Sequence, residues 1–298
     1  MIFNRARSTF VQSYLNTKYV PKHRFFGSMN VAIVGSGAVG GYYGSRLHQK
    51  HKVISKESSS SGVGVKFYMR NDHFKHCSKH GLEIKSVDGD FHIPPDELQL
   101  YDDTQKMGSF DWILISIKNS FLEDIPRLID PLLKDDGTTR ILAVMNGLMD
   151  DDLVNLLRER KCKHGTIYGG MAFICSNRPK CGLINHTSYG TLNCGLAFTP
   201  EHTCPDSELK AVEDLWKGTA VKCVTEPSLL RGRWEKQCFN LPFSGLSVAH
   251  GGISISIIAR SKSLRSLADQ LLDETIAIAN ADLSSVGVND NFLGEKEV

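Results

Sequence analysis

A short apolar stretch, residues 31–34, runs directly into a glycine-rich loop, and this junction constrains the fold more than any other feature. A helical pattern over residues 38–48 follows, so a strand, a G-x-G-x-x-G loop and a helix stand in the order of a Rossmann-type dinucleotide site. The first glycine allows a tight turn, the second lets the backbone approach a pyrophosphate, and the third lets helix and strand pack closely. The predicted cofactor-binding residues are Gly35, Ser36, Gly37, Ala38, Val39 and Gly40.

The end of the next predicted strand, residues 65–69, distinguishes between the two nicotinamide cofactors. NAD sites usually have an aspartate or glutamate there, which accepts hydrogen bonds from the ribose 2′-hydroxyl. Here Arg70 stands at that point, and a guanidinium can bind a 2′-phosphate through two parallel hydrogen bonds. The sequence therefore favours NADP(H), while the nearby Asp72 leaves NAD(H) as the alternative.

Strand and helix patterns alternate through much of the remaining chain. Residues 112–117 and 141–145 are apolar without strict alternation, as expected of parallel strands buried on both faces. A helical pattern at 122–133, limited by two prolines, lies between them, and 166–174 and 219–224 are further strand candidates. This alternation predicts an α/β domain with a parallel sheet.

The pattern becomes helical after Pro227, where no further strand signal follows. A long helix is predicted from leucines that recur at helical spacing, with Ser263 as its N-cap. We therefore predict three parts: an N-terminal extension (1–28), a dinucleotide-binding Rossmann domain (29–226), and a smaller all-helical substrate domain (227–298).

Polar residues follow two of the predicted strands at points where a packed sheet does not require them. Lys118 comes directly after residues 112–117, and Asn146 comes directly after residues 141–145. Ligands of open α/β sheets bind at the carboxyl ends of the strands, so both side chains are predicted to face the cofactor cleft. The alternatives are a solvated lysine at the strand end for Lys118 and a plain turn for Asn146-Gly147.

Three polar residues, Lys236, Asn240 and Ser244, recur every four positions in the helical part. An α-helix would present them on one face, which turns either toward water or toward a cleft facing the other domain. Pro242 would bend this helix because it removes a backbone hydrogen bond.

The glycine loop, Lys118, Asn146-Gly147 and the Lys236-x-x-x-Asn240 helix together resemble the ketopantoate reductase (2-dehydropantoate 2-reductase) family, from about Met29 to near Gly294. The resemblance implies a Rossmann domain, a helical domain and NADPH-dependent reduction of a small 2-oxo acid. It implies Lys236 as the catalytic general acid, Asn240 and Ser244 as substrate-binding residues, and Arg70, Lys118 and Asn146 as cofactor-binding residues.

A lysine is chemically suited to the role that the resemblance implies. Negative charge develops on the ketone oxygen as hydride reaches the carbon, and an ammonium can stabilise that charge and then deliver a proton. This needs a pKa not far above the working pH, which partial burial between the domains, with Lys118 nearby, would provide.

Three departures from the family pattern put catalysis in doubt. Position 244 is serine where the family usually has a further asparagine, and an insertion at 57–64 precedes the strand that selects the cofactor. The chain ends at Val298, before the helices in which the family normally has a substrate-binding serine and a glutamate. We expect the fold and cofactor site to survive, catalysis to be impaired or absent, and exposed apolar helix surface to favour a homodimer.

Charge and composition limit which other classes of partner the chain is expected to have. A net charge of +2 and the absence of a basic patch argue against nucleic acid, and no run of 18 apolar residues predicts a membrane span. Eight cysteines without any C-x-x-C pair argue against a metal site or a disulfide framework. Residues 1–28 are basic and free of acids, which is typical of an organellar transit peptide; a disordered tail, or a start of the folded part at Met29, is the alternative. The predicted location is therefore cytoplasmic or, with cleavage, mitochondrial or plastid.

Two functions of other kinds stay open at this point. The chain could bind NADP without turnover, or it could be another two-domain hydroxyacid dehydrogenase, of the 3-hydroxyacid or 6-phosphogluconate type. The sequence does not distinguish among branched 2-oxo acids, so only a panel of substrates can.

Overall fold

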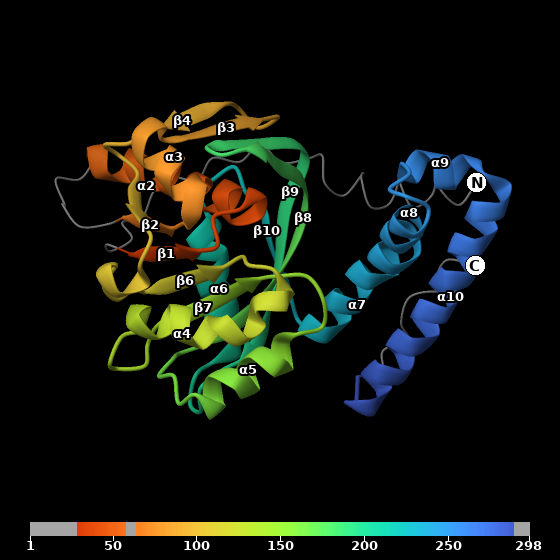
Figure 1. Cartoon of the computed structure of the whole chain (residues 1–298). Helices are drawn as coiled ribbons and strands as arrows, with labels where there is room; N and C mark the ends of the chain where they lie inside the picture. Colours follow the sequence, from red (N-terminus) through yellow and green to blue (C-terminus); the bar gives the residue numbers. More distant parts are fainter. Residues whose placement is uncertain (1–28, 58–63, 289–298) are drawn as a thin grey trace.

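The computed structural model describes residues 29–57 and 64–288 of the chain. The predicted N-terminal extension (1–28), the serine-rich part of the insertion (58–61) and the last ten residues lie outside the described residues. Figure 1 shows an α/β part and, beside it, a group of helices from the C-terminal third of the chain.

Within the described residues, the strands form a single ten-stranded sheet. The strands are β1 (Val31–Val34), β2 (Val65–Tyr68), β3 (Leu82–Ser86), β4 (Phe91–Ile93), β5 (Gln99–Tyr101), β6 (Trp112–Ile115), β7 (Arg140–Val144), β8 (Ile167–Lys180), β9 (Leu183–Phe198) and β10 (Cys223–Glu226). Their order is β4-β3-β9-β8-β7-β6-β1-β2-β5, and β10 pairs with β9.

Helices are interspersed among these strands up to β10, and the helices after β10 follow one another. The α-helices are α2 (Ala38–Glu57), α3 (Asn71–His80), α4 (Ile125–Ile129), α5 (Asp150–Glu159), α6 (Pro205–Trp216), α7 (Leu229–Phe239), α8 (Leu246–Ala249), α9 (Ile255–Arg260) and α10 (Lys262–Ser285). Tighter 3₁₀ turns occur at η1 (Thr104–Lys106), η2 (Asn119–Asp124) and η3 (Asp130–Leu132), and a wider π-helical turn at η4 (Asn240–Gly245). None of the helices in the described ranges combines the length and apolar character that crossing a bilayer requires.

Alternate residues of the central strands build two separate cores, one on each face of the sheet. Val31 and Ile33 of β1 pack in one core with α2, α3 and α6, whereas Ala32 and Val34 pack in the other with α4 and α5. A strand that buries both faces is the arrangement expected of a parallel α/β sheet covered by helices. The predicted α/β fold class with a helical part after it is therefore confirmed.

The predicted parallel sheet is right for its centre and wrong at one side. β5, β2, β1, β6, β7 and β8 are parallel neighbours, but β8 and β9 form a long antiparallel hairpin, and β3 and β4 form another. Gly182 makes the β8–β9 turn with φ of +76°, a conformation that favours glycine. The pattern missed β9 because polar residues such as His186 and Ser188 interrupt it.

Several predicted boundaries also differ from the structure. The helix expected at residues 38–48 continues to Glu57, and the strand candidates at 166–174 and 219–224 are Ile167–Lys180 and Cys223–Glu226. The helix expected at 122–133 is broken into α4 and the 3₁₀ turns on either side of it. Prolines at the starts of α4 and η3 explain the breaks, because proline fits the first turn of a helix but not its interior.

The C-terminal helices pack along α10, which contacts α7, η4 and α9 (Figure 1). Trp234 of α7 donates a hydrogen bond from its indole N–H to Asp282 of α10 at 2.7 Å and lies in a small core with Ala279 and Leu283. The predicted N-cap Ser263 is wrong: Ser261 caps α10, its hydroxyl accepting a bond from the Leu264 N–H. The chain passes from β10 to α7 between residues 226 and 229, and we propose this transition as the domain boundary.

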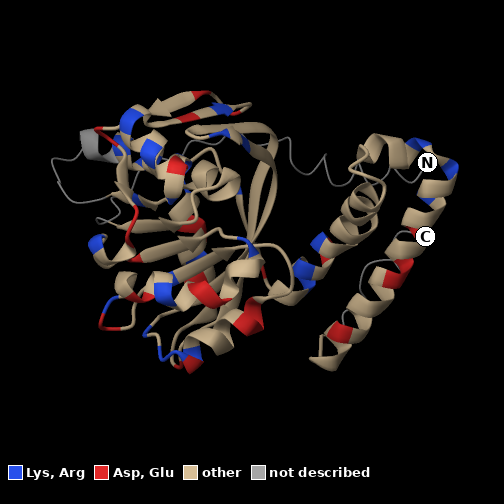
Figure 2. Ribbon diagram, in the orientation of Figure 1, with Lys and Arg blue, Asp and Glu red and all other residues tan. Residues whose placement is uncertain are grey.

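Charged residues are mixed over the surface rather than separated by sign. Lys and Arg are interspersed with Asp and Glu over the α/β part, and the C-terminal helices have long uncharged stretches (Figure 2). A surface with mixed charges has no extended region of positive or negative electrostatic potential, so electrostatic recognition depends on local groups in individual cavities.

Candidate functional site

The glycine loop has the geometry that a dinucleotide site requires. A Cβ atom at Gly35, whose φ is +97°, would lie 2.4 Å from the Ser116 carbonyl oxygen, and one at Gly40 would lie 2.2 Å from the Gly35 oxygen. At Gly37 a Cβ would meet nothing within 4 Å. The first and third glycines are therefore needed for packing inside the protein, whereas the second leaves open space for a ligand that approaches the backbone.

A cavity of about 440 Å³ adjoins this loop. Its lining includes Gly35 to Gly37, residues 68–73 at the end of β2, and Phe121 of η2. Arg70 lies in this lining, is exposed, and has its guanidinium 5.7 Å from the centre of the Phe121 ring. Ser36 ties the loop to the end of β2, because its hydroxyl donates a hydrogen bond to the Tyr68 carbonyl at 3.1 Å. Gly35, Ser36 and Gly37 thus share one cavity with Arg70, whereas the other predicted loop residues, Ala38, Val39 and Gly40, do not line it.

Helix α7 brings Lys236 to the carboxyl end of the sheet. Its Nζ atom donates hydrogen bonds to Asn146 Oδ1, just after β7, and to the Ala172 carbonyl oxygen of β8, both at 2.9 Å. The same atom lies 5.5 Å from the centre of the Phe173 ring. Two residues that the sequence singled out 90 positions apart, Lys236 and Asn146, are therefore in direct contact.

The surroundings of Lys236 make its ammonium an unusually strong acid for a lysine. Burial, together with the nearby positive charge of Arg233, lowers the pKa of Lys236 from its ordinary value of 10.5 to about 8. Removing an ammonium from water disfavours its charged form, and a like charge adds to this effect. A group with this pKa is protonated at neutral pH and can release its proton readily.

A buried ion pair that the sequence did not predict fixes α7 over the sheet. Arg233 is 2% exposed, and its Nε and Nη2 atoms donate to the two carboxylate oxygens of Asp150, each at 2.8 Å. Its Nη1 atom also donates to the Met145 carbonyl at 2.5 Å and the Gly170 carbonyl at 3.2 Å. Because Arg233 precedes Lys236 by one helical turn, these bonds hold Lys236 at the end of β7 and beside the first half of β8. Both residues are ordinary charged residues in the sequence, and no local pattern pairs them.

The rest of the predicted stripe does not continue as one α-helical face. Asn240 begins the π-helical turn η4 and is half-buried, while Ser244 is exposed within it. A π-helical turn takes in one more residue than an α-helical turn, so a spacing of four no longer keeps side chains in line. Pro242, where the sequence predicted a bend, lies within this wider turn. Neither Asn240 nor Ser244 forms a side-chain hydrogen bond with Lys236 in the described structure.

Lys118 occupies a different position from Lys236. It directly precedes η2, is exposed, and makes no side-chain hydrogen bond or ion pair with any described residue. It follows β6 by three residues, at the same edge of the sheet as Asn146. Its predicted role toward the cofactor therefore rests on its place at this edge.

The chain is similar to known proteins over most of its length. The family model described as "Ketopantoate reductase PanE/ApbA" matches residues 31–197, which include the glycine loop, Arg70 and Asn146. The curated 2-dehydropantoate 2-reductase of Nostoc sp. is 30% identical over 266 residues, which make up 88% of this chain and 75% of that protein.

Solved structures resemble the chain over a similar span. The crystal structure of 2-dehydropantoate 2-reductase from Geobacter metallireducens is 31% identical with a TM-score of 0.71, covering 85% of this chain and 76% of that one. A D-mandelate dehydrogenase solved with NADH and anilino(oxo)acetate has a TM-score of 0.70 at 18% identity, covering 85% of this chain and 74% of that one. At that identity the second likeness concerns the fold alone.

Proposed function

This chain belongs to the ketopantoate reductase family, a family of NAD(P)H-dependent oxidoreductases, and we propose that it reduces a 2-oxo acid of the 2-dehydropantoate type with NADPH and Lys236 as general acid. The contact of Lys236 with Asn146 and Ala172 at the end of the sheet is the observation that carries the proposal. A small 2-oxo acid is the substrate class of the relatives that its sequence matches.

The glycine loop and Arg70 would hold the cofactor. The open space at Gly37 fits a pyrophosphate that approaches the backbone, and Arg70 fits a 2′-phosphate through its planar guanidinium. Lys118 and Asn146 extend this surface along the ends of β6 and β7. When bound, the nicotinamide supplies the hydride, and the protein supplies orientation and electrostatic stabilisation.

Lys236 has one hydrogen-bond donor left for a substrate. An ammonium has three N–H groups, and the Asn146 and Ala172 oxygens accept two of them. The third can donate to the ketone oxygen, where negative charge develops as the carbon receives hydride. Proton transfer from Lys236 to that oxygen then completes the alcohol, and a pKa of about 8 favours this transfer near neutral pH.

Asn240 and Ser244 are the proposed substrate-binding residues. Asn240 lies one helical turn beyond Lys236 and is half-buried, so its amide could hold a carboxylate or hydroxyl of the substrate without adding charge. Ser244 is exposed and shorter, so its contact with a substrate would run through a water molecule.

A reductase assay with purified chain tests this proposal. NADPH and ketopantoate should give oxidation of the reduced nicotinamide, measured by its absorbance, and Lys236→Ala should abolish it. A panel of 3-hydroxyacids, 6-phosphogluconate and mandelate with either nicotinamide cofactor tests the other dehydrogenases that share the fold. NADPH binding without reduction of any 2-oxo acid would select a non-catalytic NADP-binding protein instead.

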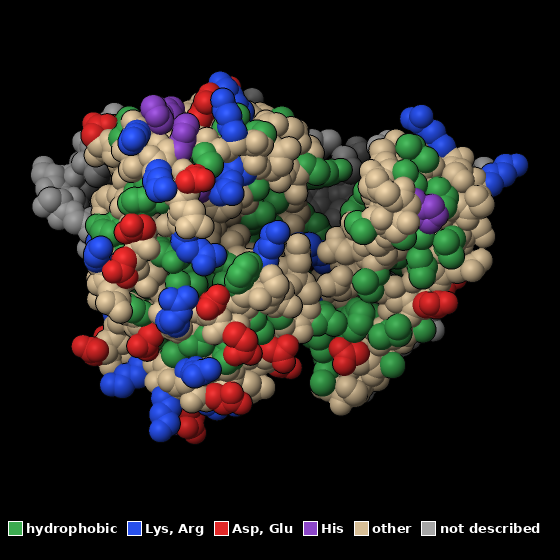
Figure 3. Space-filling model, viewed as in Figure 1, with side chains coloured by type: hydrophobic (Ala, Val, Ile, Leu, Met, Phe, Trp, Pro, Cys, Tyr) green, Lys and Arg blue, Asp and Glu red, His purple; other side chains and the backbone are tan. Residues whose placement is uncertain are grey.

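We also propose that the chain forms a homodimer through its C-terminal helices. Apolar side chains lie exposed on this part of the molecule (Figure 3), among them Val248, Ile257 and Ile278, which are 77%, 49% and 58% exposed. Such a surface is more often buried in an assembly than left in water. Sedimentation equilibrium of the purified chain measures the assembly directly, and a monomer at all concentrations would contradict this proposal.

A further inference from the structure

We propose that Arg178, carried by the β8–β9 hairpin, binds the 2′-phosphate of NADPH together with Arg70 and so helps the protein to select NADPH over NADH. The inference deepens the proposed function, on which it rests for the identity of the cofactor. Arg178 is far from Arg70 in the sequence, and the hairpin alone brings it to the cavity.

The two arginines line the same cavity from different elements. Arg70 follows β2, and Arg178 belongs to β8, yet both border the space beside Gly35, Ser36 and Gly37. Within the described residues, neither guanidinium forms an ion pair with a carboxylate. Two positive charges without a protein counter-ion, facing one cavity, are suited to a dianionic group.

The carboxylates of the same cavity have cations of their own. Asp72 pairs with Lys75 at 3.6 Å, and Asp124 pairs with Arg127 at 3.3 Å. Each pair joins residues three apart in the sequence, so both carboxylates are partly neutralised locally. They therefore leave the charges of Arg70 and Arg178 available to a ligand.

His73 ties the tip of the hairpin to the glycine loop. Its Nδ1 atom accepts a hydrogen bond from the Gly182 N–H at 3.2 Å, and its Nε2 atom lies 3.0 Å from the Ser36 carbonyl oxygen. Because Nδ1 accepts, Nε2 has the hydrogen and donates it to Ser36. Burial, with a smaller contribution from Arg178, lowers the pKa of His73 to about 4, so this tautomer persists at neutral pH.

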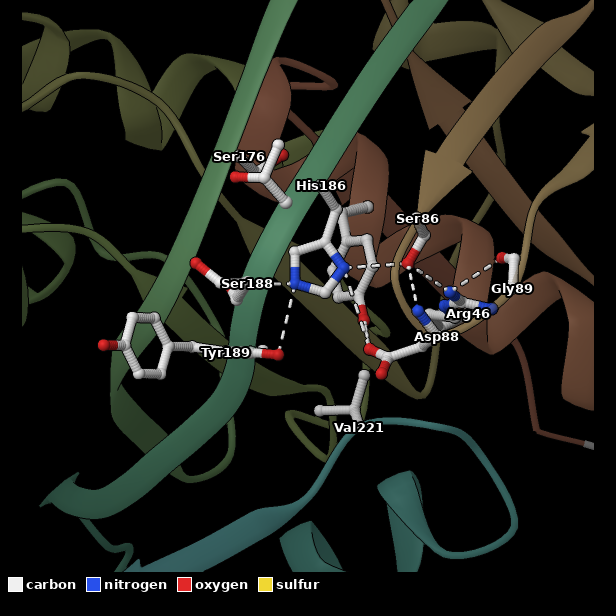
Figure 4. Close-up of polar contacts among 12 residues, drawn as sticks. Arg46, Ser86, Asp88, Gly89, Ser176, His186, Ser188, Tyr189 and Val221 are labelled. Atoms are coloured by element: carbon white, nitrogen blue, oxygen red, sulfur yellow. Dashed lines mark hydrogen bonds and ion pairs between the residues drawn. The ribbon is translucent and has the colours of Figure 1, made fainter. Parts of the chain in front are cut away.

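Two further contacts hold the body of the hairpin against the cofactor-binding part. The Ser176 hydroxyl of β8 donates to the Ala38 carbonyl in the first turn of α2 at 3.4 Å. Figure 4 shows His186 of β9 buried between Ser86 of β3 and the β9 backbone, with Nδ1 2.8 Å from Ser86 Oγ. Arg46 of α2 also donates to that Ser86 oxygen, at 2.8 Å. The hairpin that carries Arg178 is thus fixed rather than free.

The position of Arg178 favours the 2′-phosphate over the pyrophosphate. Backbone N–H groups of the glycine loop and the start of α2 are the usual partners of a pyrophosphate. Arg178 instead lies near His73, which follows the end of β2, and in Rossmann domains the adenosine ribose lies at that strand end. A 2′-phosphate has up to two negative charges there, whereas NADH has only a hydroxyl.

Binding of adenine nucleotides by the full chain tests the inference without any need for turnover. Calorimetric titration would use 2′,5′-ADP and 5′-AMP, followed by NADPH and NADH. We expect Arg178→Ala to lower the affinity for 2′,5′-ADP and for NADPH by about 10-fold to 100-fold, because one charge-assisted contact is lost. Binding of 5′-AMP and NADH should change by less than about twofold, since neither has the phosphate. Arg178→Lys should recover part of the lost affinity, because lysine keeps the positive charge but lacks the planar guanidinium that forms two parallel hydrogen bonds.

Lys180→Ala is the matched control, because it removes a positive charge from the same strand but from outside the cavity lining. It should leave all four affinities unchanged. Equal weakening of NADPH and NADH by Arg178→Ala would overturn the inference in favour of a purely structural role, and unchanged affinities would overturn it outright. Wild-type protein that fails to prefer 2′,5′-ADP would overturn it together with the proposed cofactor. NADPH selection through Arg178 without reduction of any 2-oxo acid would support the inference and contradict only the proposed reaction.

Discussion

Arg233 of α7 and Asp150 at the start of α5 join the helical part of the chain to the α/β part through two parallel hydrogen bonds of 2.8 Å, one helical turn before Lys236. The pair is buried, so it stabilises the fold only while both partners are present. It also sets the electrostatic environment of Lys236, since the Arg233 charge is one of the two causes that lower the pKa of that lysine. One ion pair thus affects both stability and the proposed catalytic acid.

Asp150→Asn should destabilise the protein by about 3 kcal/mol, because it leaves the buried Arg233 charge without its counter-ion. Urea denaturation measures the loss. Asp151→Asn is the control, as it makes the same change at the next, exposed position of α5. The double variant Asp150→Asn/Arg233→Met should lose less than Asp150→Asn alone, since the uncompensated charge is gone; a larger loss would contradict this account.

The rate of reduction should fall as the pH rises through about 8, the pKa of Lys236. A general acid acts in its protonated form, and burial lowers this pKa from 10.5, so the acidic form is lost earlier than in an ordinary lysine. The free energy of unfolding should change in the opposite direction to the rate. Between pH 8 and 10.5 the unfolded chain holds a proton that the folded chain has released, so the free energy of unfolding rises with pH there. Profiles of kcat against pH and urea titrations across this range check both expectations.

Arg233→Met separates the two causes of that pKa. Removing a like charge favours the ammonium, so the alkaline limb of the kcat profile should move to higher pH. Burial remains, and the limb should still lie below the range of a free lysine. An unchanged limb would mean that burial alone sets the pKa.

Asn146→Asp should also shift the alkaline limb upward, by a different route. A carboxylate in place of the amide oxygen 2.9 Å from Lys236 Nζ would favour the ammonium and make it a weaker acid. We therefore expect kcat to fall by about tenfold or more, with the limb moved to higher pH. The same change at Asn155, which lies on α5 beside Arg158, should leave the profile as in the wild type.

Local sequence was sufficient for the glycine loop and insufficient for what surrounds it. The roles of Gly35, Gly37 and Gly40 follow from a strand and a helix that adjoin them, so spacing alone predicted them. The contact of Lys236 with Asn146 was not predicted: strand ends placed Asn146 at the cofactor cleft, and the resemblance to a family implied a catalytic role for Lys236. Neither source predicted its geometry.

The features that were missed depend on partners far away in the chain. Arg233 and Asp150 are 83 positions apart, and each alone has the appearance of a surface charge. The hairpin strand β9 has polar residues such as His186, which hydrogen-bonds to Ser86 of β3, and they disrupt the alternation by which strands are recognised. The π-helical turn at Asn240 depends on Pro242 and on packing against α10, and spacing along the sequence describes only ideal α-helices.

Glu208→Gln should destabilise the protein at neutral pH and matter less in acid. Glu208 of α6 is buried and accepts two bonds from Arg140 at 2.7 and 2.8 Å and one from Tyr168 at 2.5 Å. These donors lower its pKa from 4.5 to about 2.

The sign of this pH dependence follows from the lowered pKa. The carboxylate stabilises the fold above its unfolded pKa of 4.5, and this contribution is lost as the pH falls from 4.5 toward 2. The variant should lose about 1–3 kcal/mol at pH 7, and the difference from the wild type should shrink over that acidic range. Urea titrations at several pH values measure it, with the exposed Glu201→Gln as control. A difference independent of pH would rule out the ionised carboxylate as its source.

Gly37→Ala and Gly40→Ala should affect different properties of the protein, although the two positions belong to one loop. The first should lower the affinity for the cofactor, and the second should lower the stability of the fold. A Cβ at Gly40 would lie 2.2 Å from the Gly35 oxygen and 2.9 Å from Ser116 Cβ, so Gly40→Ala should destabilise the fold by about 1–3 kcal/mol. At Gly37 the methyl group would meet no protein atom within 4 Å, so Gly37→Ala should fold with wild-type stability.

The methyl group of Gly37→Ala would instead occupy the space in which a pyrophosphate approaches the backbone. We expect its affinity for NADPH and for NADH to fall together by about tenfold or more, because both cofactors have the same pyrophosphate. This pattern differs from that expected for Arg178→Ala, which should affect NADPH alone. Thermal unfolding and calorimetric titration of the two glycine variants check the pair. Wild-type affinity in Gly37→Ala would mean that the cofactor does not contact this loop, whatever the stability of Gly40→Ala.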